Sequence, residues 1–395
     1  MKIITKNIEI KTPYPLAKIG DPEKLLFFDI ETTGLSAASS ALYLIGTLNL
    51  ESREEEKEKE VWKLCQFFAE DLSEELFVLK AFLSYAENFD YLLSFNGEGF
   101  DLPFLKKICA QYRLAFLPEK MRSLDIYKSI RKYRTLIRSP RMNQKSLEIF
   151  LGIERQDPYQ GRELIELYEK YLEEGRKEKE EGREKGGRRK EEARAHEELT
   201  QHKTALLHAI LLHNEEDLSS LPLLLSLLSF KDFLSCAFSF CGARREEERI
   251  ILHYRSPIEL PRDFSLQKDE FLLRSEKNLL IWESRLYSGS AKHYFDNYKD
   301  YYFLPAEDYA IHKSIGIFVS SSHRIPAKKE NAYIKKSSVY LPLPKERDDD
   351  IKAPKPELFY LESLQGRPYM ELRHFLSAPE EFKEGCLRSL LKELI

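Results

Sequence analysis

Two carboxylates stand at the end of an apolar run near the N-terminus. Residues 25–36 read LLFFDIETTGLS, in which one residue separates Asp29 from Glu31. Side chains two apart on a strand point to the same face, and like charges held that close repel each other unless a cation lies between them. Oxygen ligands of this kind suit Mg²⁺ or Mn²⁺. The pattern therefore predicts a metal site, although a bare Asp-x-Glu is also compatible with a strand that ends in two solvated acids.

A third acid follows a later apolar strand. Residues 94–105 read SFNGEGFDLPFL, and Asp101 comes directly after a loop that contains two glycines. Asp is a favoured N-cap, and Pro103 suits the first turn of a helix. Two interpretations stay open for Asp101 at this point: a metal ligand, or a cap on the helix that follows.

The remaining acid lies in LLHNEEDLSSL, residues 211–221. On a helix, Asp217 shares the apolar spacing of Ile210 and Leu221, so its carboxylate lies on or beside the buried stripe. An unpaired carboxylate there is costly, and a metal would remove the difficulty. His213 lies four residues earlier on the same face, where it could orient or deprotonate a water. The alternative is a salt-bridged Asp217 with His213 on the surface.

The spacing of apolar residues predicts the strands and helices that position these side chains. Strands are expected at residues 25–30, 41–50, 61–68 and 91–95, and helices at 73–89, 101–112, 146–151, 164–172 and 206–228. Three consecutive strands before the first helix favour an antiparallel ribbon on an otherwise parallel sheet. This order allows four acids to meet at one end of the sheet, where two-metal sites clamp a phosphodiester.

The phrases FDIETTGL, NGEGFD and HNEED resemble the three exonuclease motifs of DEDD-type, DnaQ-like 3′–5′ exonucleases of the ribonuclease-H-like superfamily. Within that superfamily the chain looks most similar to the bacterial YprB-like ribonuclease-H-like domain family, because SLDIY (residues 123–127) and KSLEIFLGIER (145–155) also resemble it. The resemblance covers about residues 20–230. It implies an α/β ribonuclease-H-like fold: a mixed sheet of three antiparallel strands plus parallel strands, flanked by helices.

The resemblance also implies the site. Two Mg²⁺ or Mn²⁺ ions would be held by Asp29, Glu31, Asp101 and Asp217. His213 would orient the attacking water, although a histidine at this spacing departs from the better-known versions of the third motif. The partner would be nucleic acid, entering as a single-stranded 3′ end. Residues expected against the terminal nucleotide are Thr32, Leu35, Asn96 and Phe100.

A basic stretch could hold the phosphates of that strand. Residues 126–147 contain no acid. Besides Lys128, the stretch contains Arg131, Lys132, Arg134, Arg138, Arg141 and Lys145. A local patch can bind phosphate on a protein whose net charge is −4, and a solvated helix face that happens to be basic is the alternative.

The chain is expected to contain an N-terminal extension (residues 1–24), a ribonuclease-H-like domain (25–230) and a C-terminal domain of unknown function (235–395). A charged insertion at 173–200 has almost no apolar side chains, so it is either a mobile segment or a solvated helix. After residue 230, short runs such as RIILHYR, LLIWESRLY and GIFVSS predict an α+β or β-rich domain. The aromatic stretch 287–319 could stack bases, but such residues more often form sheet and core.

No run approaches 18 consecutive apolar residues, and the N-terminus lacks the apolar core of a signal peptide. We therefore expect a cytoplasmic protein with no membrane partner. Two functions from different classes are compatible with the sequence: a divalent-metal nuclease, and a nucleic-acid-binding or scaffold protein on the same fold without catalysis. The presence of all four acids favours the enzyme.

Overall fold

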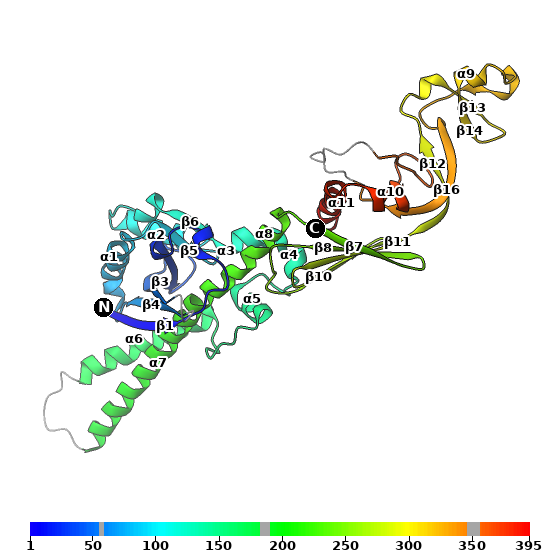
Figure 1. The fold of residues 1–395 in the computed structure, drawn as a ribbon. Coiled ribbons are helices and arrows are strands. Elements are labelled where there is room, and N and C mark those ends of the chain that lie inside the picture. Colours follow the sequence, from blue (N-terminus) through cyan, green and yellow to red (C-terminus); the bar gives the residue numbers. More distant parts are fainter. Residues whose placement is uncertain (55–58, 182–189, 346–355) are drawn as a thin grey trace. The chain divides into compact units, whose positions relative to one another are not determined.

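The computed structural model of the chain describes residues 1–54, 59–181, 190–345 and 356–395 (Figure 1). Its residues pack into two units, which are described here one at a time. The first contains Met1–Arg134 and Ser139–Ser229, and the second contains Thr135–Arg138 and Phe230–Ile395.

A six-stranded mixed sheet organises the first unit, in the order β1-β4-β3-β2-β5-β6. Its strands are β1 (Lys2–Glu9), β2 (Leu25–Thr32), β3 (Leu42–Glu54), β4 (Lys59–Phe68), β5 (Tyr91–Ser94) and β6 (Arg122–Asp125). Neighbours from β1 to β2 pair antiparallel, whereas β2, β5 and β6 run parallel. The predicted fold class, a mixed sheet of ribonuclease-H-like type, is confirmed.

Two of the six strands were not expected from the sequence. β1 lies within the predicted N-terminal extension, and it pairs with β4 along its whole length at the sheet edge. Most of its side chains are exposed, so the apolar signal of a strand is weak. β6 has only the four residues RSLD, which are too few and too polar for the pattern to predict a strand.

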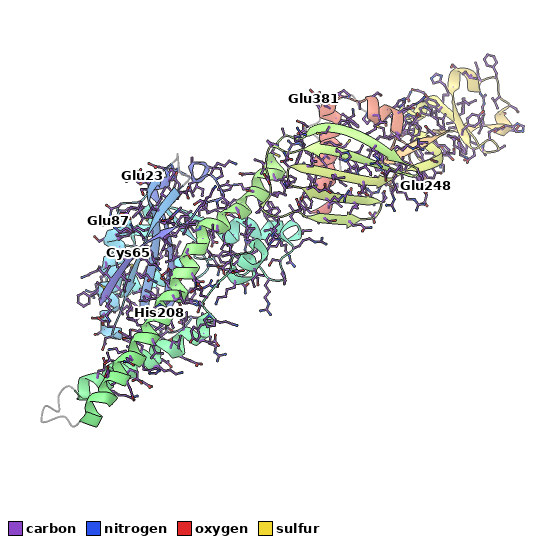
Figure 2. All side chains as sticks on the ribbon, turned by 60° about the horizontal axis from the view of Figure 1, so that its bottom comes forward. Glu23, Cys65, Glu87, His208, Glu248 and Glu381 are labelled. Atoms are coloured by element: carbon purple, nitrogen blue, oxygen red, sulfur yellow. The ribbon has the colours of Figure 1, made fainter. Side chains whose placement is uncertain are left out.

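Helices cover both faces of the sheet. Those of the first unit are α1 (Glu75–Ala86), α2 (Asp101–Gln111), α3 (Ile126–Ile130), α5 (Gln144–Leu151), α6 (Gly161–Glu181) and α7 (Lys190–Leu224). The short helix α4 (Arg134–Ile137) falls at the boundary between the units. Figure 2, which labels Cys65 on β4 and His208 on α7, shows α7 lying along the sheet, where it packs on β2 and β3.

The alternation of β2 explains how its acids come to face α7. Leu26, Phe28 and Ile30 belong to the apolar core that includes α1, and the ring of Phe28 stacks on Phe82 of α1 with centroids 6.0 Å apart. Successive side chains on a strand point to opposite faces. Asp29 and Glu31 therefore point away from α1.

The predicted charged insertion, residues 173–200, is helical at both its ends. α6 and α7 lie side by side in Figure 1 and are joined by an ion pair from Lys203 Nζ to Glu178 Oε2 (2.6 Å). Alternating Glu, Lys and Arg residues are good helix formers and need no core of their own. Residues 182–189, the middle of the predicted insertion, lie outside the described part of the chain, as do residues 55–58 of the expected hairpin loop.

The second unit is rich in β-structure. Its largest sheet has the order β7-β8-β11-β10-β9, and two three-stranded sheets have the orders β12-β16-β17 and β14-β13-β15. The strands are β7 (Ser239–Glu246), β8 (Arg249–Arg255), β9 (Ser265–Lys268), β10 (Phe271–Glu276), β11 (Leu279–Arg285), β12 (Tyr287–Tyr294), β13 (Tyr301–Leu304), β14 (Tyr309–His312), β15 (Ile325–Pro326), β16 (Tyr333–Pro342) and β17 (Tyr369–Glu371). The helices are α8 (Ser229–Ser235), α9 (Lys313–Gly316), α10 (Leu372–Ser377) and α11 (Glu380–Leu394).

The prediction of a strand at GIFVSS was wrong. α9 ends at Gly316, and no described strand begins until Ile325. Phe318, in the middle of this run, is 86% exposed. A short apolar run predicts a strand only when a neighbouring strand is available to pair with it.

One stretch, Glu197–Ser235, is long and apolar enough to cross a membrane by length and composition. However, 61% of its most apolar window is buried inside the protein. Ile210 and Leu221, for example, are almost fully buried. We therefore interpret this stretch as a core helix.

Candidate active site

The carboxylates of β2 lie at the end of the strand that leads into the loop after Thr32. Asp29 is opposite Gly46 of β3, and Glu31 is opposite Leu44. The side chain of Glu31 is 12% exposed. Both acids are therefore held on a rigid central strand at the edge of the core rather than in open solvent.

Asp101 joins them from α2. The helix begins at Asp101 itself, with Phe100 in the N-cap position, so Asp101 is not the cap that one sequence interpretation allowed. Its Oδ1 accepts a hydrogen bond from the backbone N–H of Ile30 (3.3 Å), the residue that separates Asp29 from Glu31. The structure thus places the carboxylate of Asp101 beside both acids of β2.

The third motif lies on α7, and its side chains reach the same site. Nε2 of His213 lies 3.2 Å from Oδ2 of Asp217 and 3.7 Å from Oε1 of Glu31. The potential ligand atoms of Glu31, His213 and Asp217 all lie within 4.8 Å of one another. All five residues that the three motifs offered for catalysis are therefore brought together.

Burial and mutual repulsion raise the proton affinity of three of the acids. Burial raises the pKa of Asp29 well above its ordinary 3.8, and the charges of Glu31, Asp217 and Asp101 raise it further. Burial likewise raises the pKa of Glu31 to about 8 and that of Asp101 to about 7. The charge of His213 lowers the pKa of Glu31, but it does not cancel the effect of burial and of the neighbouring acids.

Asp217 and His213 behave differently because they compensate each other. Burial alone would raise the pKa of Asp217, but the hydrogen bond and charge of His213, together with Arg155, lower it below its ordinary value. Burial alone would lower the pKa of His213, but Asp217, Glu31 and Asp157 raise it above 6.5.

The donor set fits a divalent cation. Two ligand atoms bound to one ion at about 2.1 Å are separated by at most about 4.2 Å, so the oxygens of Glu31 and Asp217, which lie within 4.8 Å of each other, need only a small closure to share one. Asp29 and Asp101 add carboxylates with raised pKa values at the same place. A cation would supply the positive charge that these buried acids lack.

Arg155, which was not predicted from the sequence as a site residue, binds Asp217 and two further acids beside the site. Its Nη1 lies 2.5 Å from Oδ1 of Asp217 and 3.1 Å from Oε2 of Glu148, and its Nε lies 3.4 Å from Oε2 of Glu216. Only Oδ2 of Asp217 is therefore left to face the other acids. The nearly buried Glu148 further accepts a hydrogen bond from Ser220 Oγ (2.6 Å), which ties α5 to α7.

Two amide side chains, those of Asn214 and Gln66, form a buried pair, and Asn214 binds Asp29. Nδ2 of Asn214 donates to Oδ2 of Asp29 (3.0 Å), and Oδ1 of Asn214 accepts from Nε2 of Gln66 (2.9 Å). Gly46 makes room for this pair, because a Cβ at that position would lie 2.0 Å from Oδ1 of Asn214. Asn214 stands on the apolar stripe of α7, and that is the signal by which the sequence could have revealed it.

The residues predicted to contact the terminal nucleotide lie at the end of β2, in the loop that follows it, and in the loop after the neighbouring parallel strand β5. The hydroxyl of Thr32 donates to the main-chain oxygen two residues on (2.8 Å), and Leu35 is 88% exposed. Asn96 is exposed with φ 62°, and its N–H donates to Oδ1 of Asp125 (3.0 Å). Phe100 is half-buried directly before α2. Parallel neighbours end at the same edge of a sheet, so both loops border the acids.

Some cations of the basic stretch are exposed and free of ion pairs among the described residues, whereas others are paired with acids. Arg131, Lys132, Arg134 and Arg141 are exposed and make no ion pair among the described residues. Lys145, predicted to hold phosphate, is instead turned inward: its Nζ pairs with Asp157 (3.2 Å) and donates to the carbonyl of Tyr159.

Lys128 and Arg138 are exposed as well, but their surroundings differ from those of the other four cations. Lys128 forms an ion pair with Glu98 (2.5 Å). Arg138 lies in Thr135–Arg138, which packs with the second unit, so it is counted with that unit.

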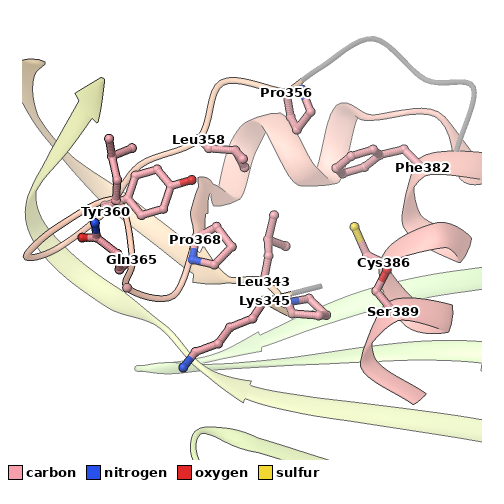
Figure 3. Close-up of a pocket in the computed structure, with 13 residues that line it drawn as sticks. Leu343, Lys345, Pro356, Leu358, Tyr360, Gln365, Pro368, Phe382, Cys386 and Ser389 are labelled. Atoms are coloured by element: carbon pink, nitrogen blue, oxygen red, sulfur yellow. The ribbon is translucent and has the colours of Figure 1, made fainter. Parts of the chain in front are cut away.

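The second unit contains another group of potential ligands, namely Glu357, Glu371 and His374. The carboxylate of Glu371 already pairs with Lys336 and with Nε of Arg373 (2.7 Å), so we assign no metal to it. A cavity of about 250 Å³ lies beside α11, lined mainly by apolar residues such as Leu358 and Phe382 (Figure 3).

A family model described as the RNase_H superfamily matches residues 26–229 of the chain. This range contains every acid of the site. No curated protein sequence matches the chain.

The solved structures that match parts of the chain include exonucleases and a polymerase. E. coli exonuclease I in complex with a dT13 oligonucleotide is 15% identical, with a TM-score of 0.26 over 33% of this chain and 36% of that chain. The family B DNA polymerase of the archaeon Pyrobaculum calidifontis is 12% identical, with a TM-score of 0.32 over 94% and 41% of the two chains. The matches thus cover well under two thirds of these proteins, and identities this low transfer no activity.

Proposed function

This chain belongs to the ribonuclease H superfamily, and from that premise we propose that it is a divalent-metal nuclease that hydrolyses phosphodiester bonds of nucleic acid. The single observation that carries the proposal is the position of Asp101. Its carboxylate bonds to the N–H between Asp29 and Glu31, although 70 or more residues separate it from them in the chain. Buried acids that meet in this way, with their negative charge only partly compensated by His213 and Arg155, favour the binding of a cation.

The roles of the residues follow from their contacts. Asp29, which is coupled to all three other acids, takes the central position among the ligands Glu31, Asp101 and Asp217. Divalent cations held there would polarise the phosphoryl oxygens and lower the pKa of an attacking water. Nε2 of His213 faces the same space and can orient that water or accept its proton.

The protein itself positions these groups before substrate arrives. Asn214 fixes one oxygen of Asp29, and Arg155 fixes one oxygen of Asp217. Each acid then presents its remaining oxygen in one direction. This preorganisation avoids the cost of ordering the ligands during the reaction.

The finer proposal is a two-metal, DEDD-type 3′–5′ exonuclease of the YprB-like group, acting on a single-stranded 3′ end with Mg²⁺ or Mn²⁺. The motifs FDIETTGL, NGEGFD and HNEED support it. The exposed loop residues Leu35 and Asn96 would contact the terminal nucleotide. The exposed cations Arg131, Lys132, Arg134 and Arg141 would contact phosphates.

The experiment uses the full-length protein with single-stranded DNA and RNA labelled at the 5′ end. We expect a ladder of shortened products with Mg²⁺ or Mn²⁺, none with EDTA, and none with Asp29→Asn. Glu87→Gln, an exposed acid on the same unit, serves as the matched control and should cleave like the wild type. A ladder that persists in Asp29→Asn would refute the assignment of the site.

The same experiment decides between the nuclease and a binding or scaffold protein on this fold. Labelling at the 3′ end as well distinguishes direction, because a 3′–5′ exonuclease releases that label as a mononucleotide at once. Tight binding of the oligonucleotides without cleavage under every metal would favour the binding protein and overturn the enzymatic proposal.

A further inference from the structure

Asp157 is a buried acid that lies outside the three motifs, in the loop between α5 and α6. Its side chain is 1% exposed, so its charge requires partners. Oδ1 accepts a hydrogen bond from the N–H of Tyr159 (3.0 Å). Oδ2 lies 2.6 Å from Nδ1 of His213 and 3.2 Å from Nζ of Lys145. The shortest of these contacts is the one to His213.

The loop that carries Asp157 is clamped to the helix that carries His213. Both oxygens of Glu216 on α7 accept loop N–H groups, from Gln156 (2.8 Å) and from Asp157 itself (2.9 Å). Arg155 adds a further tie, because its Nη2 donates to the carbonyl of His213 (3.4 Å). The position of Asp157 relative to His213 is therefore set by main-chain contacts as well as by its own side chain.

The imidazole of His213 presents its two nitrogens to different acids. Nδ1 faces Asp157, whereas Nε2 faces Asp217 (3.2 Å) and Glu31 (3.7 Å). A ring turned over by 180° would place a C–H group against Asp157 and lose the 2.6 Å bond. A carboxylate on Nδ1 thus selects both the orientation of the ring and the nitrogen that carries the proton.

We propose that Asp157 is a positioning residue of the nuclease site, which holds His213 through Nδ1 so that Nε2 serves the attacking water. The holding is a property of the protein alone, and its use in hydrolysis rests on the proposed function. The contact between Asp157 and His213 also explains how a histidine only one helical turn before Asp217 can orient the attacking water. The orientation of the ring comes from a loop outside the third motif, and not from the spacing of residues within that motif.

A purely structural role is the alternative, in which Asp157 merely neutralises Lys145 and Arg155 and stabilises the loop. Glu163→Ala is the matched control for that role. Glu163 accepts the N–H of Gln160 (2.7 Å) at the other end of the same loop, and in the described part of the chain it makes no hydrogen bond or ion pair with His213. We expect Glu163→Ala to loosen the loop and to leave the contact between Asp157 and His213 in place.

The first measurement is nuclear magnetic resonance of the metal-free, full-length protein labelled with ¹⁵N-histidine, in EDTA. The ring signals of His213 are assigned by their loss in His213→Gln. We expect a proton on Nδ1 that exchanges slowly with solvent, that is lost or exchanges rapidly in Asp157→Asn, and that is unchanged in Glu163→Ala. A wild-type ring without a proton on Nδ1, or one insensitive to Asp157→Asn, overturns the proposal.

The second measurement is a double-mutant cycle on cleavage of the labelled oligonucleotide. We expect Asp157→Asn to lower kcat by about 10–100-fold with KM changed less than about threefold. In the His213→Gln background the same change should alter kcat by less than about twofold, because Asp157 acts only through His213. Equal losses of kcat in both backgrounds show a structural role and overturn the proposal. A wild type without activity under every metal refutes the proposed function instead, and the resonance measurement then still shows whether Asp157 holds His213.

Discussion

Replacement of Glu31 by glutamine should stabilise the metal-free protein at the same time as it impairs cation binding. The carboxyl group of Glu31 is largely buried on β2, and burial raises its pKa from 4.5 to about 8 even though the charge of His213 acts in the opposite direction. Its ionised form is therefore unfavourable in the folded state. Glutamine keeps the shape of the side chain and removes that charge.

The magnitude follows from proton linkage. Between pH 4.5 and about 8 the folded protein keeps a proton on Glu31 that the unfolded chain has released, so the free energy of unfolding falls as pH rises through this window. A pH of 7 lies about 2.5 units above the pKa of this group in the unfolded chain. At about 1.36 kcal/mol per unit, the free energy of unfolding is therefore lower at pH 7 by roughly 3 kcal/mol. We expect Glu31→Gln to raise the free energy of unfolding by about 1–3 kcal/mol at pH 7 and by little near pH 4.

Urea unfolding in EDTA measures this difference at several pH values. Trp62 and Trp282 are the two tryptophans of the chain, one in each unit, so a Trp282→Phe background makes the fluorescence report on the first unit. Glu87→Gln is the control and should change stability little at any pH. Addition of Mn²⁺ should stabilise the wild type more than Glu31→Gln. A Glu31→Gln protein that is less stable than wild type at pH 7, or equally stabilised at pH 4, would refute this reasoning.

Three further predictions concern the surroundings of the site. Gly46→Ala should lower the free energy of unfolding by about 1–3 kcal/mol in urea titrations, because the new Cβ would meet Oδ1 of Asn214 at 2.0 Å. Arg155→Met should cost about 3–5 kcal/mol in the same assay, since it leaves buried carboxylates unpaired; stability equal to wild type would contradict this. The double change Arg131→Gln and Lys132→Gln should weaken binding of single-stranded oligonucleotides, and the slope of log affinity against log salt concentration should fall by about one to two, with unfolding unchanged.

The acids of the motifs were predictable because local periodicity encodes their direction. Asp29 and Glu31 share a strand face, and His213 and Asp217 share a helix face, whatever the rest of the chain does. Asp101 was ambiguous in the sequence because a residue that opens a helix is also a good cap. Only the hydrogen bond from Ile30, a contact between distant segments, shows that its carboxylate faces the other acids.

The residues that support the acids could not be predicted in the same way. Asp157 and Arg155 lie in an irregular loop, and Gln66 is one polar residue in a strand, so no period marks them. Their partners on α7 are about 60 to 150 residues away in the chain. Lys145 shows the same limit, because a basic residue in a basic stretch was predicted to hold phosphate and nothing in the sequence indicated that it pairs with Asp157. Side-chain pairing across the fold decides such cases.

The most direct test is a crystal of the wild-type protein soaked in Mn²⁺, with the ions located by their anomalous scattering. We expect cation density within bonding distance of carboxylate oxygens of Asp29, Glu31, Asp101 and Asp217, at about 2.1–2.3 Å. No such density should appear in crystals of Asp29→Asn treated identically. Ions that bind only elsewhere, or these four carboxylates remaining without a cation at saturating Mn²⁺, would contradict a metal-dependent hydrolytic site.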